Sequence, residues 1–273
     1  MHLLVATGGS RHSEIAVRAG LGLAFRVDAE VTLLFVVKNQ AGRATALRTL
    51  DSLCAQSSAK KLRIRRKVRV GRVLPALYDE LRERPADLLV LGERIPHRLL
   101  TRIRGSVVAR VASSAPCPVL IAKRADIPLS HVLICDSGAA PPTVFDGLTA
   151  HGMLPFFTES AITVLHVMSQ ISAGPGVQGR QLRAGFDDLI QAHAPEGELL
   201  ARDLALLQGQ GLSAAAKVRH GLVVDEILAE ATEGDHGLIV IGGHRTGGWP
   251  ALLLDDLAHQ IVTRLDRSLL VVR

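Results

Sequence analysis

The run Asp87-Leu88-Leu89-Val90-Leu91-Gly92 opens the segment from which the fold of this 273-residue chain can be read. A basic loop follows it, Gly105-Ser106-Val107 comes next, and the segment closes on Val119-Leu120-Ile121-Ala122. A short apolar run that stops at a glycine is typical of a buried strand, and Gly-Ser before a periodic apolar stretch is typical of a helix start. The segment therefore predicts strand, loop, helix and strand. The free N–H groups at the start of that helix could receive an anion.

The composition indicates an α/β protein with an aliphatic core. Hydrophobic residues make up 48% of the chain and aromatic residues only 3%, so the core must consist mainly of Val, Leu, Ile and Ala. Such runs suit parallel strands that helices cover on both faces. The length allows one large domain or two ordinary ones. The net charge of +6 and the pI near 9.7 favour anionic partners in general without identifying one.

The sequence shows no sign of export, membrane insertion or a metal centre. No signal peptide is expected, because the first residues form a strand without a basic region and a cleavage site. No apolar run reaches the ~18 residues of a membrane helix. Cys54, Cys117 and Cys135 are unclustered, which argues against a disulfide framework and a zinc site, and the histidines show no metal-ligand spacing. We therefore expect a cytoplasmic protein with buried thiols, no membrane contact and no metal.

The order of predicted strands and helices occurs twice. In the first copy, strands are predicted at 2–7, 30–37, 62–70, 87–92 and 117–122, with helices at about 10–26, 44–59 and 73–84 and from 106 onward. In the second copy, strands are predicted at 131–136, 162–167, 214–218, 237–242 and 269–272, with a helix at 223–232.

The spacing between the copies indicates a duplication. Gly71, Gly92 and Leu120 of the first copy match Gly221, Gly242 and Leu270 of the second, and all three pairs share one offset. Earlier in the chain, Val36 matches Val167 and Gly8 matches Asp136, at smaller offsets. The sequence therefore predicts two domains, 1–126 and 127–273, the second with a 19-residue insertion between its strands two and three, inside residues 169–212.

The hydrophobic pattern also predicts the order of the strands. Residues 62–70 alternate apolar side chains with Arg and Lys, which is typical of a strand at a sheet edge with one face in water. Strands one and four are apolar throughout and belong in the middle. Each domain is therefore expected to be a doubly wound parallel sheet of order 3-2-1-4-5. Its ligands are expected at the carboxyl ends of strands one and four, where the order reverses.

Several short motifs together resemble one family. They are Ala6-Thr7-Gly8-Gly9-Ser10, Leu33-Leu34-Phe35-Val36, Val90-Leu91-Gly92, Gly105-Ser106-Val107 and Cys117-Pro118-Val119-Leu120. On these residues the chain resembles a tandem universal stress protein, with two copies of the domain over nearly its whole length. The resemblance implies two Rossmann-like five-stranded sheets packed as an internal pseudo-dimer through the fifth strands. It also implies a cytoplasmic stress-response protein that binds or regulates rather than an enzyme, with a weak ATPase activity left open.

The resemblance further implies a site for ATP or another adenine nucleotide in the first copy. The residues that it assigns to this site are Ala6, Gly8, Val36, Gly92, Ile95, Gly105, Ser106 and Val107. Two of them depart from the family pattern, because Ile95 stands in place of a glycine and Gly8 in place of an aspartate. Four arginines of the loop, at 94, 98, 102 and 104, could offset these losses by attracting phosphate, or could be a solvated loop face.

The second copy keeps different parts of the same site. Asp136, Val167 and Gly242 match the family, but Arg245 replaces the second glycine and Asp255-Asp256 replaces Gly-Ser. Two carboxylates at a helix start satisfy its N–H groups from within and repel a triphosphate. The second site is therefore expected to be degenerate.

Two other functions remain as alternatives. The protein could act without a nucleotide, through a homo-oligomer or a protein partner, because both sites have lost residues. A phosphate-loop hydrolase has less support, because no acid–base pair is visible near the loop. Nucleic-acid binding by the basic run Lys60 to Arg72 is not favoured, since no aromatic residues are interleaved for stacking and an edge strand explains the run.

Overall fold

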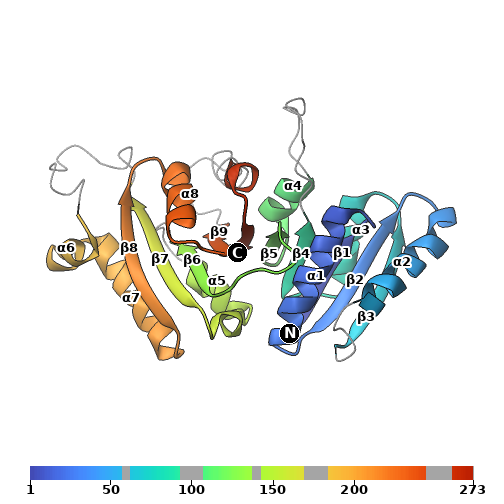
Figure 1. Ribbon diagram of the computed structural model, residues 1–273, viewed down its shortest axis with the longest axis horizontal. Coiled ribbons are helices and arrows are strands. Elements are labelled where there is room, and N and C mark those ends of the chain that lie inside the picture. Colours follow the sequence, from blue (N-terminus) through green and yellow to red (C-terminus); the bar gives the residue numbers. More distant parts are fainter. Residues whose placement is uncertain (57–61, 93–106, 137–142, 169–183, 244–259, 273) are drawn as a thin grey trace. The chain divides into compact units, whose positions relative to one another are not determined.

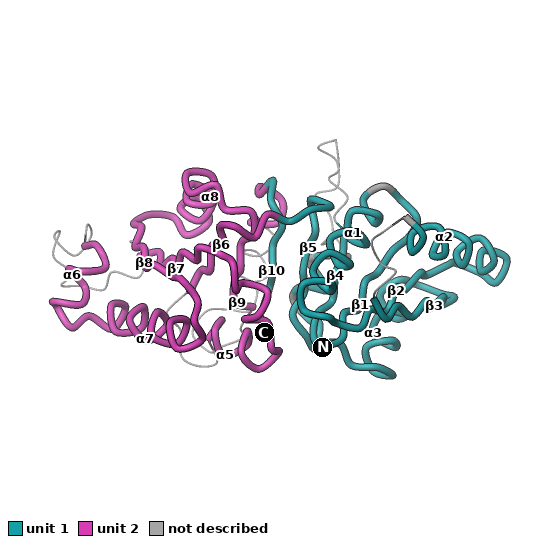
Figure 2. The backbone as a smooth tube through the Cα atoms, turned by 60° about the horizontal axis from the view of Figure 1, so that its bottom comes forward, with its two compact units in different colours: residues 1–127, 266–271 teal, residues 128–265, 272–273 magenta. Residues whose placement is uncertain are grey.

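A computed structural model describes residues 1–56, 62–92, 107–136, 143–168, 184–243 and 260–272 (Figure 1). The contacts among these residues divide the chain into two compact units (Figure 2). The first unit comprises Met1–Ile127 and Asp266–Val271, and the second comprises Pro128–Leu265 and Val272–Arg273. Each unit is a parallel sheet covered by helices.

The first unit confirms the predicted strand order. Its strands are β1 (His2–Thr7), β2 (Glu30–Val37), β3 (Ile64–Val70), β4 (Leu88–Gly92) and β5 (Val119–Ala122). They pair in parallel in the order β3-β2-β1-β4-β5. The helices are α1 (Arg11–Arg26), the short 3-10 helix η1 (Gln40–Gly42), α2 (Arg43–Gln56), α3 (Val73–Glu83) and α4 (Val107–Ser114). The start of α1 follows from its sequence, because Ser10 and Ser13 form a reciprocal capping box there.

The last strand of the chain lies beside β5 in the sheet. β10 (Ser268–Val272) pairs antiparallel with β5, with Leu269 opposite Ile121 and Leu270 opposite Leu120. The predicted contact between these two apolar runs is therefore confirmed, and it covers the edge of β5. The packing of a whole pseudo-dimer stays a prediction.

The second unit repeats the plan with longer connections. Its parallel strands are β6 (His131–Cys135), β7 (Ala161–Met168), β8 (Ser213–His220) and β9 (Leu238–Gly242), in the order β9-β6-β7-β8. Its helices are α5 (Val144–Ala150), the 3-10 helix η3 (Leu154–Phe157), α6 (Phe186–Gln191), α7 (Pro195–Gly209) and α8 (Val223–Glu233). Helices α6 and α7 lie in the predicted insertion. α5 was missed by the sequence analysis, although Thr143 and Asp146 form a capping box at its start.

The edge position of β3 is confirmed, but only part of its charged face lies in water: Arg65 is exposed, whereas Lys67 and Arg69 are held by α3. The side chains of Lys67 and Arg69 are only 28% and 16% exposed, because they pair with Glu80 of α3. Arg66, on the other face, pairs with Asp51 of α2. Since alternate residues of a strand point to opposite faces, α2 and α3 cover the two faces of this edge. The expectation of one face in water was therefore wrong at Lys67 and Arg69, because it ignored the carboxylates that the next helix supplies.

The described residues bear on three further expectations. All three cysteines are free, and burial raises the pKa of the Cys117 thiol to about 12. None of the helices in these parts of the chain combines the length and hydrophobicity of a membrane span. Within the same ranges, no three His, Cys, Asp or Glu side chains are grouped so that they could hold a metal ion.

Candidate nucleotide site

The sheet of the first unit brings some of the predicted site residues to one edge. Ala6 and Gly8 lie at the carboxyl end of β1, Val36 near the end of β2, and Gly92 at the end of β4. β1 pairs in parallel with both β2 and β4, so these ends meet at one edge of the sheet. The other predicted residues, Ile95, Gly105 and Ser106, lie outside the described residues together with the four loop arginines. Val107 begins α4, and its side chain also lies outside the described part.

Gly8 stands beside open space. A Cβ atom built on it would meet no atom within 4 Å. The next residue, Gly9, has a φ of +71° and lies against the ring of Phe35 from β2, so this turn needs a glycine at position 9 but not at position 8. The absence of the family aspartate at position 8 is therefore not imposed by packing.

Gly92 is required for packing, whatever the site binds. A Cβ atom on this residue would lie closer than 3.0 Å to the backbone carbonyl oxygen of His12, in the first turn of α1. α1 approaches β4 so closely that only a glycine fits. In the second unit, a Cβ atom on Gly242 would meet its nearest neighbour, Val144, at 3.9 Å, which is ordinary contact. Gly92 is thus explained by the fold and carries little weight as a sign of nucleotide binding.

The strand register corrects the predicted equivalence of Gly8 and Asp136. Leu3 lies opposite Leu88, and Val132 lies opposite Leu238, which is the counterpart of Leu88 in the duplication. Leu3 therefore corresponds to Val132, and further along the same strands Thr7, not Gly8, corresponds to Asp136. A shift of one residue moves a side chain to the other face of a sheet. The true counterpart of Gly8 is position 137, a serine outside the described residues, and neither copy has an aspartate there.

The carboxyl group of Asp136 points into the second unit. Asp136 is 4% exposed, and its backbone N–H donates to the carbonyl oxygen of Leu165. Its side chain lies close enough to Asp203 of α7 to affect the pKa of that fully buried carboxyl group. Arg202 donates to the carboxylate of Asp203 at 2.9 Å. Burial, with a smaller contribution from Asp136, raises the pKa of Asp203 to about 7 against the opposing effect of Arg202.

Asp136 is therefore a partner in a buried carboxyl pair. The two other residues that the resemblance assigns to the second site, Val167 and Gly242, lie half-buried at the ends of β7 and β9. These strands flank β6, which ends directly before Asp136. The three residues thus come from neighbouring strand ends, but the carboxyl group is turned toward α7.

This pair predicts that the second unit loses stability as the pH rises. The folded form of Asp203 holds its proton up to about pH 7, whereas the unfolded chain releases it near 3.8. Between pH 3.8 and about pH 7 the folded state therefore binds more protons than the unfolded chain. The free energy of unfolding must fall as the pH rises through this range. We expect Asp203→Asn to flatten this slope and to be more stable than the wild type at pH 8. Urea unfolding from pH 5 to pH 8 checks this, and an unchanged slope would contradict it.

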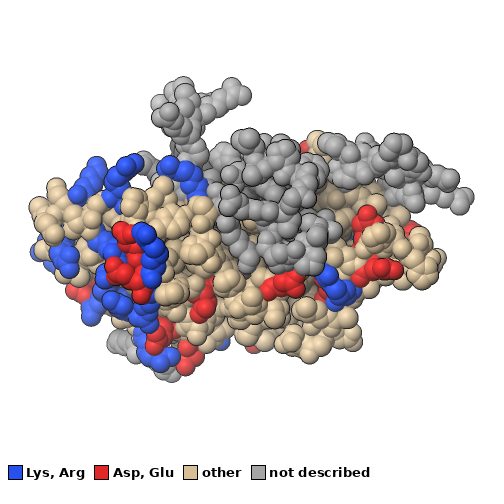
Figure 3. Space-filling view, turned by 180° about the vertical axis from the view of Figure 1, so that it is seen from behind, with Lys and Arg blue, Asp and Glu red and all other residues tan. Residues whose placement is uncertain are grey.

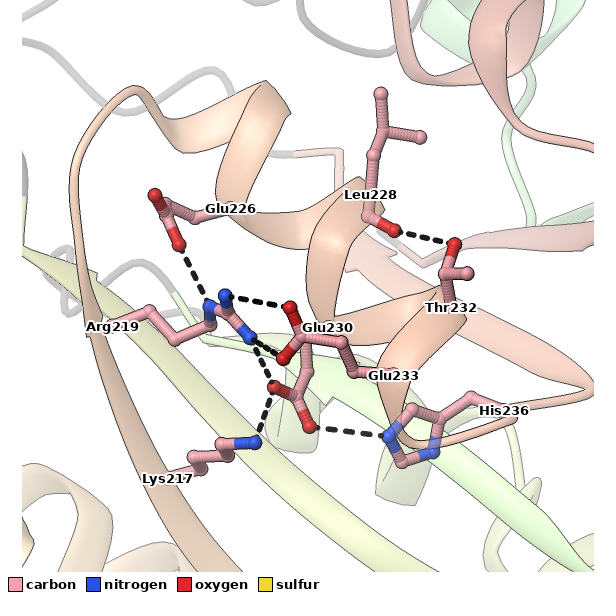
Figure 4. Close-up of polar contacts among 8 residues, drawn as sticks. All are labelled: Lys217, Arg219, Glu226, Leu228, Glu230, Thr232, Glu233 and His236. Carbon is pink, nitrogen blue, oxygen red and sulfur yellow. Dashed lines mark hydrogen bonds and ion pairs between the residues drawn. The ribbon is translucent and has the colours of Figure 1, made fainter.

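A charged cluster that the sequence analysis missed is repeated in both units. In the first unit, Arg69 bonds Glu80 at 2.7 Å and Glu83 at 2.5 Å, and Lys67 lies beside both carboxylates. In the second unit, the equivalent cluster comprises Lys217, Arg219, Glu230 and Glu233, with Glu226 and His236 added (Figure 4). The four shared positions follow the constant offset that relates Gly92 to Gly242, which is the signal that could have revealed them. They are structural, because they join the edge strand to the helix that follows it.

A comparison with known protein families shows which family this chain belongs to. The sequence model of the universal stress protein family matches residues 1–123 and 158–273. The chain belongs to the universal stress protein family. The two matched segments agree with a tandem protein. No match was found among curated proteins.

Two crystal structures share the fold of this universal stress protein. One is a universal stress protein from Archaeoglobus fulgidus DSM 4304, which is 16% identical and has a TM-score of 0.69, with 100% of this chain and 96% of that chain covered. The other is a putative universal stress protein from Pseudomonas aeruginosa UCBPP-PA14, which is 17% identical and has a TM-score of 0.67, with 99% and 92% covered. At these identities the likeness shows the fold alone.

Proposed function

We propose that this universal stress protein binds ATP or another adenine nucleotide in its first unit only, and acts in the stress response as a binding or regulatory protein. The observation that carries the proposal is the open space beside Gly8, at the edge where β1, β2 and β3 end. Exposed Lys38 follows β2 and exposed Arg72 follows β3 at this edge. Such cations attract phosphate groups.

Two described residues of the second unit differ at its equivalent edge. Leu222, which is 62% exposed, stands at the position that corresponds to Arg72 and carries no charge. Asp136 is buried against Asp203 and so is not presented to a ligand. The net charge supports the same assignment, because residues 1–127 contain 23 basic and 10 acidic residues, whereas residues 128–273 contain 9 and 16. A nucleotide is therefore attracted to the first unit and repelled by the second.

Gly8→Asp tests this proposal. The variant supplies the carboxylate that the family resemblance places beside adenosine, and the open space admits it. We expect isothermal titration with ATP and magnesium to show weak binding by the wild type and about tenfold tighter binding by Gly8→Asp, because a hydrogen bond to a charged group contributes about 1.5 kcal/mol or more. Ser137→Asp, the register-matched change in the second unit, is the control and should leave binding unchanged. No heat from either wild type or Gly8→Asp at millimolar nucleotide would end the proposal.

A nucleotide-independent stress protein is the second candidate. It is favoured by the finding that Gly92 is explained by the packing of α1 and that position 8 has lost its carboxylate. In that case the protein would act through contacts with other proteins. Finding ATP bound in the purified protein would refute this nucleotide-independent function. Either candidate is proposed to act in the cytoplasm and without catalysis, and the free thiols of all three cysteines support the reducing compartment.

A further inference from the structure

The two units carry opposite charge although they share one fold. Residues 1–127 have a net charge of +13 and residues 128–273 a net charge of −7, which add to the +6 of the whole chain. On the face drawn in Figure 3, Lys and Arg side chains gather over the first unit, and mostly Asp and Glu side chains are seen over the second. A charge difference of this kind within a duplicated protein is not needed for folding, because the same sheet forms in both units. It therefore points to association.

The opposite charges lie on equivalent helices. α2 packs on β2 and β3, the outer strands of the first unit, and α7 packs on β7 and β8, the outer strands of the second. α2 exposes Arg43 and Arg48, and the neighbouring β3 exposes Arg65. We call these three residues the basic edge. In the described part of the chain, no carboxylate pairs with any of them.

The insertion supplies the acidic counterpart. α7 begins with Glu196 and Glu198, and α6, which packs on it, begins with Asp187 and Asp188. We call these four residues the acidic edge. Arg202 is the only base on the two helices, and it is engaged by Asp203. Among the described residues, no Lys or Arg forms an ion pair with the acidic edge. Each edge thus carries a surplus of one sign that no ion pair between described residues neutralises.

We propose that the basic edge of one copy of this chain binds the acidic edge of a second copy. Both edges belong to the same chain, so a second copy is a partner whose charge complements each of them. Two different surfaces then meet, so the contact is heterologous and can continue from copy to copy into short chains. A nucleic acid fits less well, because the acidic unit repels it and neither α2 nor β3 contains an aromatic residue on which a base could stack.

Sedimentation velocity of the full chain tests the proposal. We expect the wild type to associate at about 20 mM NaCl and to dissociate at about 500 mM NaCl, since exposed charges are screened beyond a few ångströms at high salt. Arg43→Glu/Arg48→Glu and Glu196→Lys/Glu198→Lys should each weaken association at low salt by at least about tenfold, because the first leaves one Arg beside two Glu on the basic edge and the second leaves two Asp beside two Lys on the acidic edge.

Mixing the two reversed variants gives the decisive result. The first variant keeps an intact acidic edge and the second keeps an intact basic edge. Neither should associate alone, but in an equimolar mixture the two intact edges can bind each other, so association should return. The thermal midpoint of each variant controls for folding, because Lys in the first turn of α7 opposes the helix dipole. Glu196→Gln/Glu198→Gln provides a milder second variant.

The proposal would be overturned by a wild type that stays monomeric at low salt, by association that the reversals leave unchanged, or by a mixture that stays dissociated. A single-stranded oligonucleotide could also bind the chain and prevent its self-association. That result would overturn the proposal and identify the basic edge as a nucleic-acid site.

Discussion

Arg219→Met is expected to lower the free energy of unfolding of the second unit by about 3–5 kcal/mol, the range for breaking a buried ion pair from one side. The Arg219 side chain is 18% exposed and reaches Glu226, Glu230 and Glu233 at 2.7 to 2.8 Å (Figure 4). Glu230 itself is 2% exposed. Without the guanidinium, three carboxylates face one another with Lys217 as the nearest base, so the variant loses both attraction and hydrogen bonds.

The pH dependence of this cluster has the opposite sign to that of Asp203. Burial acts to raise the pKa of Glu230, but hydrogen bonds from Lys217 and Arg219 outweigh it and hold the pKa below its usual value. The stability that the cluster supplies is therefore present above the unfolded pKa of 4.5 and is lost as the pH falls below it. Arg219→Met should reduce this dependence, because only Lys217 then holds down the pKa of Glu230 by a strong hydrogen bond. Urea unfolding by circular dichroism, with hydrogen exchange of the β8 and α8 amides, measures both effects.

Two matched variants separate burial from ion pairing in this prediction. Arg264 pairs with Asp225, but their side chains are 50% and 46% exposed, so Arg264→Met should cost no more than about 1 kcal/mol. Adding Glu230→Gln to Arg219→Met should recover part of the loss, because it removes the buried charge that was left unpaired. Equal losses for Arg219→Met and Arg264→Met would show that the cluster contributes no more than a surface pair.

Gly92→Ala is expected to destabilise the first unit by about 2 kcal/mol or more, which is the usual scale of overpacking a well-packed site. The added methyl group would overlap the carbonyl oxygen of His12, which is backbone and cannot rotate away. α1 would have to move off β4 as a whole. The thermal midpoint and the hydrogen-exchange protection of the α1 amides would report this movement directly.

Gly242→Ala is the matched control in the second unit. Its new methyl group would meet Val144 at 3.9 Å, so we expect a change within about 0.5 kcal/mol. The pair of variants also bears on function, because a nucleotide-binding role for Gly92 predicts lost affinity without lost stability. If Gly92→Ala left the thermal midpoint unchanged but abolished the heat of ATP binding, the packing explanation would be wrong.

The candidate site could be predicted only in part, and the errors have identifiable causes. Gly8, Val36 and Gly92 lie at the predicted strand ends because the strand order was correct. Asp136 was assigned to the wrong position, because a motif comparison tolerates a shift of one residue and a hydrogen-bonded register does not. The charge pairing of Arg69 and Arg219 was missed because it joins a strand to the following helix across a turn.

The sequence by itself determined the duplicated α/β plan, the strand order and, to within a residue, the ends of α1, α3 and α8. These features depend on local patterns: apolar runs specify central strands, and capping residues such as Ser10 specify where a helix begins. Only the tertiary structure decided that Gly92 and Asp136 serve the packing of the fold. The carbonyl of His12 on Gly92 and the carboxyl of Asp203 beside Asp136 come from distant segments, and their distances and burial are set by packing rather than by any local pattern.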